Sequence, residues 1–384
     1  MSFNWLVDTL VHALGIALAF AATGYACVAL WAVTKGSRKT HPVSAPAGTP
    51  RPASVLKPLH GTEPRLYENL RSFCQQTHPD YQLVFGVREA DDPAIAVVER
   101  LRREFPQLPM ALAIDSRVHG ANFKVSNLIN MLPHARHDHL VLADADIHVQ
   151  PDYLTRVTTP LADSDVGIVT CLYYGRPGPS LWSRLGRLFI DDWFAPSVKL
   201  SHAFGSTRFA FGSTIALRRN ALAAIGGFAA LRDTLADDFW LGELTRRAGL
   251  RTVLSDVVVG TDVGESQLKD LWSHELRWLR TIRSIAPAGF AMTFVCFASP
   301  LLGLGLCLAP GPTSGSLALL GGAARVLLHF LQRRFSDRAF AWHEVLLIPL
   351  RDTLLLMEWA AALAGWQVRW RGQVLHARGD GSAP

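Results

Sequence analysis

Acidic residues that follow predicted strands are the first candidates for chemistry in this sequence. Asp144 and Asp146 come directly after the apolar run 139–143 (HLVLA), and Asp92 follows the run 81–87 (YQLVFGV). Carboxylates gathered in one place repel one another unless a cation or hydrogen-bond donors compensate. A D-x-D pair alone is a weak signal, but its place after a buried strand adds weight. Asp144 and Asp146 are therefore candidate ligands of a divalent cation, Mg²⁺ or Mn²⁺, that bridges to diphosphate oxygens.

A third acidic pair, Asp237 and Asp238, precedes an amphipathic helix predicted over 239–248. Acids at a helix N-terminus interact favourably with the helix dipole, by about 0.3–1 kcal/mol, and need no further function. The alternative is a general base that takes a proton from a hydroxyl group. Asp238 is the candidate for that role.

The segment HELRW at 274–278 combines basic and aromatic residues on a predicted helix. His274 and Arg277 share one face at spacing i, i+3. Together with Trp278 they could bind a diphosphate and close over a ring. The alternative is a helix at the membrane boundary, which basic and aromatic side chains favour.

The elements that must position these residues alternate along the chain. Predicted strands near 55 and at 81–87, 110–114, 139–143 and 166–172 alternate with predicted helices at 63–76, 93–105 and 124–131. This order predicts a mainly parallel α/β sheet, in which ligands bind beyond the carboxyl ends of the strands. The acidic residues follow those ends. Glycine-rich dinucleotide and P-loop motifs are absent from the sequence, so those nucleotide sites lack support.

Composition divides the chain into a membrane part and a water-soluble part. Of 384 residues, 49% are hydrophobic and 18% charged, and the formal net charge is +6. Soluble domains carry about 25% charged residues. Residues 59–285 hold 25 Lys and Arg against 26 Asp and Glu, so the positive charge lies in the flanks. This composition excludes a disordered chain and a disulfide scaffold, and the nearly neutral middle argues against a nucleic-acid partner.

Hydrophobic segments at both ends predict a bilayer protein. The uncharged run 11–33 is about 34 Å long as a helix, enough to cross a membrane. A signal peptide would carry positive charge before this run, where the sequence has Asp8 instead. Positive residues follow the run, which predicts that residue 34 onward is cytoplasmic. We further expect spans at 286–310 and 314–331.

Residues 341–366 carry charges that are costly at membrane depth. They predict a re-entrant or interfacial helical hairpin broken near Pro349. The predicted parts are a transmembrane anchor at 1–33, a basic Pro/Ala/Ser linker at 34–54, the α/β domain at 55–285, membrane segments at 286–366 and a cytoplasmic tail at 367–384.

Six motifs in a fixed order carry a family resemblance. The chain resembles the family 2/21 GT-A glycosyltransferases, in particular the ceramide glucosyltransferases and the bacterial hopanoid-biosynthesis glycosyltransferases. The resemblance covers about 55–285 and continues weakly into the tail. The matching segments are DDPAIAVVERL at 91–101, NFKVSNLIN at 122–130, DADIHVQPDYL at 144–154, FGSTIALRR at 211–219, LADDFWLGELTRRAGLR at 235–251 and HELRWLRTIR at 274–283.

The resemblance implies a GT-A domain with assigned site residues. It places Gln or Arg where this chain has His274, so the role of His274 is open, with a pH-dependent contribution as one possibility. The implied roles are uridine contact for Asp92, a place near the donor phosphates for Lys124, metal and diphosphate binding for Asp144 and Asp146, the catalytic base for Asp238, and diphosphate or acceptor binding for Arg277 and Trp278.

The function that we expect is inverting, metal-dependent transfer of a single sugar to a membrane lipid alcohol. The donor would be UDP-N-acetylglucosamine or UDP-glucose, and a hopanoid polyol is the favoured acceptor. The alternatives are a ceramide glucosyltransferase and a non-enzymatic, membrane-tethered scaffold that binds sugar nucleotides. A processive polysaccharide synthase would need more membrane segments to enclose a channel. We expect a multi-pass protein of the bacterial inner membrane with its catalytic domain in the cytoplasm.

Overall fold

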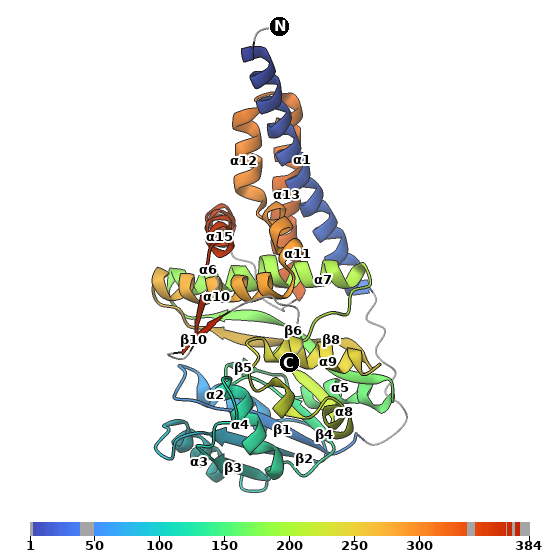
Figure 1. The fold of residues 1–384 in the computed structure, drawn as a ribbon, viewed down its shortest axis with the longest axis vertical. Coiled ribbons are helices and arrows are strands. Elements are labelled where there is room, and N and C mark those ends of the chain that lie inside the picture. Colours follow the sequence, from blue (N-terminus) through green and yellow to red (C-terminus); the bar gives the residue numbers. More distant parts are fainter. Residues whose placement is uncertain (1–2, 39–49, 336–341, 366, 371–372, 377–384) are drawn as a thin grey trace. The chain divides into compact units, whose positions relative to one another are not determined.

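The computed structural model describes residues 3–38, 50–335, 342–365, 367–370 and 373–376. Contacts between residues divide the chain into two units (Figure 1). The sheet unit comprises Thr40–Arg176 and Ser206–Asp262, and the helical unit comprises Met1–Lys39, Pro177–Gly205 and Val263–Gly381. Each unit is described by itself. Parts of the predicted linker (39–49) and tail (371–372, 377–384) lie outside the described residues.

The sheet unit is built on eight strands in the order β3-β2-β1-β4-β7-β6-β8-β5. The first four pair in parallel, with Ala53 opposite Tyr81 and His139, and Leu83 opposite Met110. The next strand, β7, pairs antiparallel with both β4 and β6. The strands are β1 (Ala53–Pro58), β2 (Tyr81–Val87), β3 (Met110–Ile114), β4 (His139–Leu142), β5 (Ile147–His148), β6 (Val166–Pro177), β7 (Ile215–Arg218) and β8 (Arg251–Val263).

Helices cover both faces of this sheet because its central strands are apolar on both sides. Successive residues of a strand point to opposite faces, so Val55 packs in one core cluster and Leu56 in the other. The first cluster holds side chains of α2 (Leu66–Cys74), α3 (Ala94–Glu104) and α5 (Tyr153–Thr158). The second holds those of α4 (Phe123–Met131), α8 (Arg219–Ala224), η4 (Phe228–Leu231) and α9 (Asp237–Arg247). Short 3₁₀ turns follow α4 (η1, Leu132–His134) and α5 (η2, Thr159–Ala162).

The helical unit contains α1 (Phe3–Arg38), which packs along α12 (Ala298–Leu308) and α13 (Pro312–Phe335). Small residues allow this close approach, as is common between membrane helices. A Cβ atom added at Gly305 would lie 2.8 Å from the Ala19 Cβ, and one added at Gly15 would lie 2.9 Å from the Ala309 Cβ. Figure 1 shows the three helices side by side.

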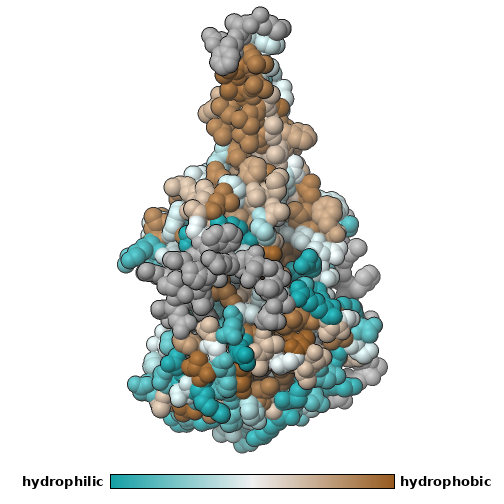
Figure 2. Space-filling view, in the orientation of Figure 1, coloured by the Kyte–Doolittle hydropathy of each residue, from teal (hydrophilic) through white to brown (hydrophobic). Residues whose placement is uncertain are grey.

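Two helices of the helical unit are long and apolar enough to cross a membrane, at Trp5–Lys35 and Pro312–Arg334. The segment predicted as one span at 286–310 is bent by 67° between Pro287–Cys296 and Ala298–Leu308. This pair comprises α11 (Pro287–Met292), the 3₁₀ turn η5 (Thr293–Cys296) and α12. Large apolar side chains of the two candidate spans, such as Phe20 of α1 and Leu319 of α13, are exposed. Figure 2 shows hydrophobic surface in the region of these helices.

The segment predicted as a hairpin contains two helices among its described residues. The helix is interrupted at Leu346, between α14 (Trp342–Val345) and α15 (Leu347–Leu363), and not at Pro349. Pro349 lies in the first turn of α15, where a missing N–H is tolerated. The other elements are α6 (Leu181–Phe189), the π-helix η3 (Ile190–Phe194), α7 (Ala195–Ala203), α10 (Leu268–Ile285), β9 (Gln367–Trp370) and β10 (Gln373–His376).

Candidate active site

Asp144 and Asp146 occupy the turn that joins β4 to β5 in the sheet unit. The Thr261 hydroxyl donates a hydrogen bond to Asp146 Oδ2. Burial and the neighbouring Asp144 carboxylate raise the pKa of Asp146 to about 7. Two crowded carboxylates, one of which resists ionisation, fit the binding of a hard cation, which would relieve their repulsion.

The donor set for such a cation is small. Among the residues that the structure describes, no three His, Cys, Asp or Glu side chains form a group that could hold a metal ion. Asp144 and Asp146 stay the predicted carboxylate ligands. The remaining positions would be left to water and ligand oxygens, as Mg²⁺ commonly has them.

Lys124 connects the two acidic pairs of the sheet unit. Its Nζ lies 2.6 Å from Asp144 Oδ1 and 3.4 Å from Asp237 Oδ2. Burial disfavours its charge, but the surrounding aspartates overcome this effect and raise the pKa of Lys124 above its usual value. Lys124 is therefore a permanently charged ammonium group beside the proposed metal ligands.

Asn122 fixes the helix that presents Lys124. It caps the N-terminus of α4, accepting at Oδ1 a hydrogen bond of 3.1 Å from the Val125 amide. Its Nδ2 donates to the Thr234 carbonyl at 2.9 Å. Capping satisfies a helix-end amide that would otherwise lack a partner, and the second bond ties α4 to the segment before α9.

Asp238 lies in the first turn of α9, and backbone amides hold its carboxylate. Oδ2 accepts from the Gly212 amide at 3.0 Å, and Oδ1 accepts from the Phe239 amide at 2.8 Å. Burial and the adjacent Asp237 raise the pKa of Asp238 to about 6. A fixed carboxylate with a pKa near neutrality is suited to general base catalysis.

Two residues of this site, Gly212 and Lys57, are not among the predicted site residues. A Cβ atom at position 212 would lie 2.8 Å from Asp144 Oδ2 and 3.2 Å from Lys124 Nζ. Lys57 is fully buried in β1, donates a hydrogen bond to the Asp144 carbonyl and lies 4.0 Å from the centre of the Phe73 ring. Burial lowers its pKa to about 7. The sequence features that could have indicated these two residues are a lysine within an apolar strand and a glycine within the motif FGST.

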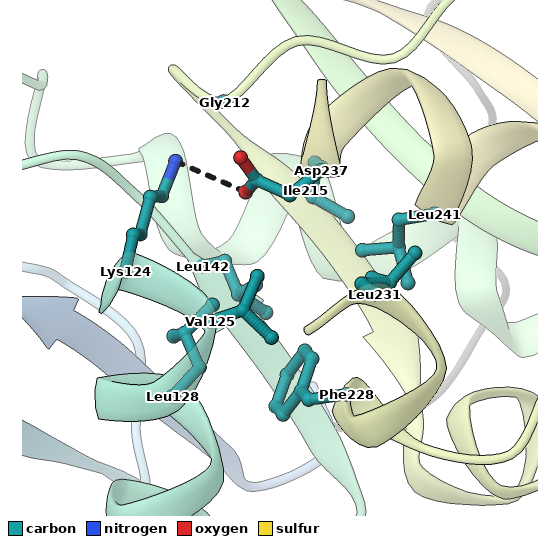
Figure 3. A pocket seen from close by; sticks show the side chains of 10 residues that line it. All are labelled: Lys124, Val125, Leu128, Leu142, Gly212, Ile215, Phe228, Leu231, Asp237 and Leu241. Carbon is teal, nitrogen blue, oxygen red and sulfur yellow. Dashed lines mark ion pairs between the residues drawn. The ribbon is translucent and has the colours of Figure 1, made fainter. Parts of the chain in front are cut away.

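An apolar pocket lies beside the Lys124–Asp237 ion pair (Figure 3). In the close-up, Lys124 points toward Asp237, and the hydrophobic side chains lie below the pair and to its right. Low-dielectric surroundings of this kind strengthen interactions between charges. The pocket is lined by Lys124, Val125, Leu128, Leu142, Gly212, Ile215, Phe228, Leu231, Asp237 and Leu241.

Asp92 follows β2, as predicted, and is buried. Both carboxylate oxygens lie 3.0 Å from the Gly61 amide, which donates to them, and Oδ1 also accepts from the Ala94 amide at 2.9 Å. The side chain therefore joins the loop after β1 to the start of α3. Its contact with a uridine stays a prediction.

His274, Arg277 and Trp278 lie on α10 of the helical unit. His274 Nδ1 bonds to the Glu265 carboxylate, and the His274 ring packs edge-on against Trp278 with centroids 4.5 Å apart. An ionised carboxylate only accepts hydrogen bonds, so Nδ1 carries the proton. Bonding to His274 lowers the pKa of Glu265 in spite of burial. Nothing in the sequence predicts that Glu265 is the hydrogen-bond partner of His274.

One protein family matches almost the whole chain. The profile of glycosyl transferase family 21 matches residues 14–383. The chain belongs to glycosyl transferase family 21. The expectation of a glycosyltransferase is thereby confirmed at the level of the family.

Curated relatives carry a narrower name at low identity. The chain is 25% identical over 203 residues to ceramide glucosyltransferase 1 of Caenorhabditis elegans, which covers 53% of this chain and 43% of that protein. It is 22% identical over 238 residues to ceramide glucosyltransferase 3 of the same organism, covering 61% and 51%. The chain thus spans about half the length of the curated relatives it matches.

A solved structure has a similar fold. The mannosyltransferase of Pyrobaculum calidifontis in complex with GDP-Man and Mn²⁺ matches with a TM-score of 0.58 and 22% identity, over 91% of this chain and 98% of that one. The predicted fold class, an α/β GT-A domain flanked by apolar helices, is therefore confirmed. The sheet is mixed, with its parallel strands at one side.

Proposed function

We propose that this family 21 member catalyses inverting transfer of a single hexose from a UDP-sugar to a hydroxyl group of a membrane lipid. The observation that carries the proposal is the Asp238 carboxylate, which shares Gly212 as a neighbour with Asp144 and Lys124. The proposed base, an ammonium cation and one of the two proposed metal ligands thus lie around one glycine. Glycosyl transfer from a diphosphate donor can use all three: a base for the acceptor hydroxyl, and a cation and a metal ion for the leaving diphosphate.

In this mechanism Asp238 takes the proton of the attacking hydroxyl. The amides of Gly212 and Phe239 orient its two oxygens. The acceptor oxygen attacks the anomeric carbon from the side opposite the diphosphate, whose bond to the sugar breaks as the new bond forms. An α-linked donor would therefore yield a β-glycoside.

The leaving diphosphate needs positive charge. A divalent cation bound by Asp144 and Asp146 would supply Lewis-acid stabilisation of the diphosphate, and the Mn²⁺ in the structure of the P. calidifontis mannosyltransferase supports this choice. Lys124 would add a fixed positive charge beside the phosphates. We assign Asp92 to the uridine.

The motif on α10 would complete donor and acceptor binding. Arg277 and Trp278 are proposed to contact the diphosphate or the acceptor. With Nδ1 bonded to Glu265, His274 has Nε2 as its second ring nitrogen for hydrogen bonding.

A sphingoid lipid is the acceptor that we propose, in preference to the hopanoid polyol. The curated relatives described above are ceramide glucosyltransferases, which supports ceramide. Ceramide presents a primary hydroxyl at the membrane surface, where a membrane-bound enzyme can reach it. The apolar helices support an enzyme that works at the bilayer, and the positive residues after α1 support a cytoplasmic catalytic domain. A bacterial inner membrane remains our proposed location.

The test uses the purified full-length chain in lipid nanodiscs with Mn²⁺. UDP-glucose and UDP-N-acetylglucosamine are each offered with ceramide or with a hopanoid polyol, and mass spectrometry identifies the glycolipid. Asp238→Asn should lower the turnover about 10²–10⁴-fold. Glu243→Gln is the matched control, because Glu243 lies on the same helix and its carboxylate pairs with Arg246 and Arg247 rather than with Gly212 or Lys124.

Each outcome has a meaning. Glucosylceramide from the wild-type chain, lost in Asp238→Asn and kept in Glu243→Gln, supports the proposal. Exclusive glycosylation of the hopanoid would refute the acceptor while leaving the mechanism intact. A folded Asp238→Asn variant with wild-type turnover would refute the assigned base.

A further inference from the structure

The exposed surface of α15 is an uncharged stripe along one side of the helix. Leu346, which precedes the helix, is 78% exposed, and Leu350, Met357 and Leu363 are 48%, 56% and 47% exposed. Residues at such spacings share one helix face. Between them the exposed positions are Pro349, Thr353 and Ala360. No described exposed residue between 346 and 364 carries a charge.

The charged residues of α15 face the protein instead. Arg351 is fully buried and does not belong to the stripe. Its Nη2 lies 2.7 Å from Glu275 Oε2 of α10 and 2.6 Å from Glu358 Oε2. Asp352 accepts hydrogen bonds from the Ser299 amide at 3.1 Å and from its hydroxyl at 2.8 Å. A surface helix in water instead exposes its charged residues.

Asp352 also fixes the level of α15 along the candidate span α13. Its Oδ1 lies 2.9 Å from Arg325 Nη2. Arg325 is nine residues before Arg334, the end of the span, which is about 14 Å along the helix axis. The hydrocarbon core is about 30 Å thick, so this contact falls within one leaflet.

The direction of α15 differs from that of the spans. Figure 1 shows α15 end-on, whereas α12 and α13, in the same unit, are seen from the side. A helix that crosses α13 at this angle lies in the plane of a membrane that α13 spans. It has 17 residues, of which three are charged, and it is not among the candidate spans of the described chain.

We propose that α15 is an in-plane membrane helix that inserts its uncharged stripe into the acyl chains of one leaflet. The occupant of this surface is bilayer lipid, because α15 packs on α12, which itself exposes the large apolar side chains Leu304 and Leu306. Charges at this depth are tolerated when they face protein, as Arg351 and Asp352 do. The inference stands apart from the sugar transfer proposed above.

The first experiment needs no substitution. The full chain is reconstituted in phosphatidylcholine vesicles that contain a lipophilic carbene reagent, and labelled residues are identified by mass spectrometry after photolysis. Leu350 and Met357 should be labelled as strongly as Leu319 and Leu327 of α13, which are 78% and 47% exposed. Water, a second copy or a soluble partner on the stripe would leave it at background while α13 is labelled, which would overturn the proposal.

The second experiment asks whether α15 crosses the bilayer. His343 and Ala364 are exposed at its two ends. His343→Cys and Ala364→Cys chains in sealed vesicles are treated with a membrane-impermeant maleimide from one side, with the parent chain's own thiols as background. Both should react from the side on which Arg334→Cys reacts. Reaction of the two ends from opposite sides would show a crossing helix and contradict the proposal.

Both experiments use control residues that lie outside α15. Arg334 marks the end of the candidate span Pro312–Arg334. Ile114 and Val118 of the sheet unit are 48% and 50% exposed, so they report labelling of apolar side chains that lie outside a membrane. They should stay at background in the carbene experiment.

Discussion

The environment of Asp238 sets the pH range in which the proposed base can act. Its pKa is raised to about 6, mainly by burial and by Asp237. The base must be ionised, so kcat/KM should fall as the pH drops below about 6, approaching tenfold per pH unit. A pH profile of glycolipid formation at saturating Mn²⁺ measures this limb. If the profile stayed flat down to pH 5, Asp238 could not be the base.

Gly212 is the residue at which the smallest change should disturb the site. In Gly212→Ala the new Cβ would lie 2.8 Å from Asp144 Oδ2, so the carboxylate has to move. Because a side-chain end can move, we expect the fold to survive while the affinity for Mn²⁺ and the turnover fall. Gly178→Ala is the control, since its Cβ would find no atom closer than 3.6 Å. Titration of Mn²⁺ against both variants tests the difference.

Single residues differ in how far the sequence could predict them. Asp144, Asp146 and Asp238 stand next to recognisable strands and helices, so their positions follow from local pattern. Lys57 and Thr261 act on the same acids from strands that are distant in sequence, and only tertiary pairing brings them there. The partners of an aspartate are therefore much harder to predict than the aspartate itself.

At the scale of elements, the N-cap of α4 should couple stability to the site. Asn122→Ala removes the bond to the Val125 amide and leaves the buried Thr234 carbonyl without the amide donor. We expect a loss of about 1–2 kcal/mol in unfolding free energy and weaker donor binding, because α4 carries Lys124. Thermal unfolding and donor titration measure the two effects.

Asn122→Ser separates the two bonds of this residue. Serine keeps an oxygen that can cap α4, but it is too short to replace the amide bond to Thr234. Its unfolding midpoint should lie between those of the wild type and Asn122→Ala. An Asn122→Ala chain as stable as the wild type would show that the cap is unimportant.

The elements that were predicted well are those with a strong periodic pattern. The strands at 81–87 and 110–114 are β2 and β3 to the residue, and the helix at 93–105 is α3 within one residue at each end. The strand β8 was not predicted, because its mixed exposure leaves no clean alternation. The bend of 67° within 287–308 could not be read from hydropathy, which averages over it.

At the scale of the whole molecule, a buried charge cluster joins several helices of the helical unit. Arg325 of α13 pairs with Asp192 of η3 at 3.0 Å and with Asp352 of α15 at 2.9 Å. His329 Nδ1 also lies 2.9 Å from Asp192. Removing one partner leaves buried charge uncompensated, which typically costs about 3–5 kcal/mol.

Arg325→Leu should therefore destabilise the helical unit strongly. The expected result is a large fall in the thermal midpoint of the full chain in nanodiscs. Adding Asp192→Asn and Asp352→Asn should restore part of the loss, because the uncompensated charges are then gone. No recovery in the triple variant would show that packing of the arginine stem, rather than charge, dominates.

The same cluster imposes an order on biosynthesis. Asp192 is translated 133 residues before Arg325, a delay on the order of ten seconds at the usual rate of synthesis. Residues 206–262, the last segment of the sheet unit, are synthesised during that interval. During this time Asp192 has no ion pair with Arg325, because Arg325 does not yet exist. A chain that has emerged only as far as residues 263–324 thus holds all the segments of the sheet unit but lacks the arginine of the cluster. The helical unit can therefore complete its charge cluster only after its C-terminal helices, α13 and α15, have been synthesised.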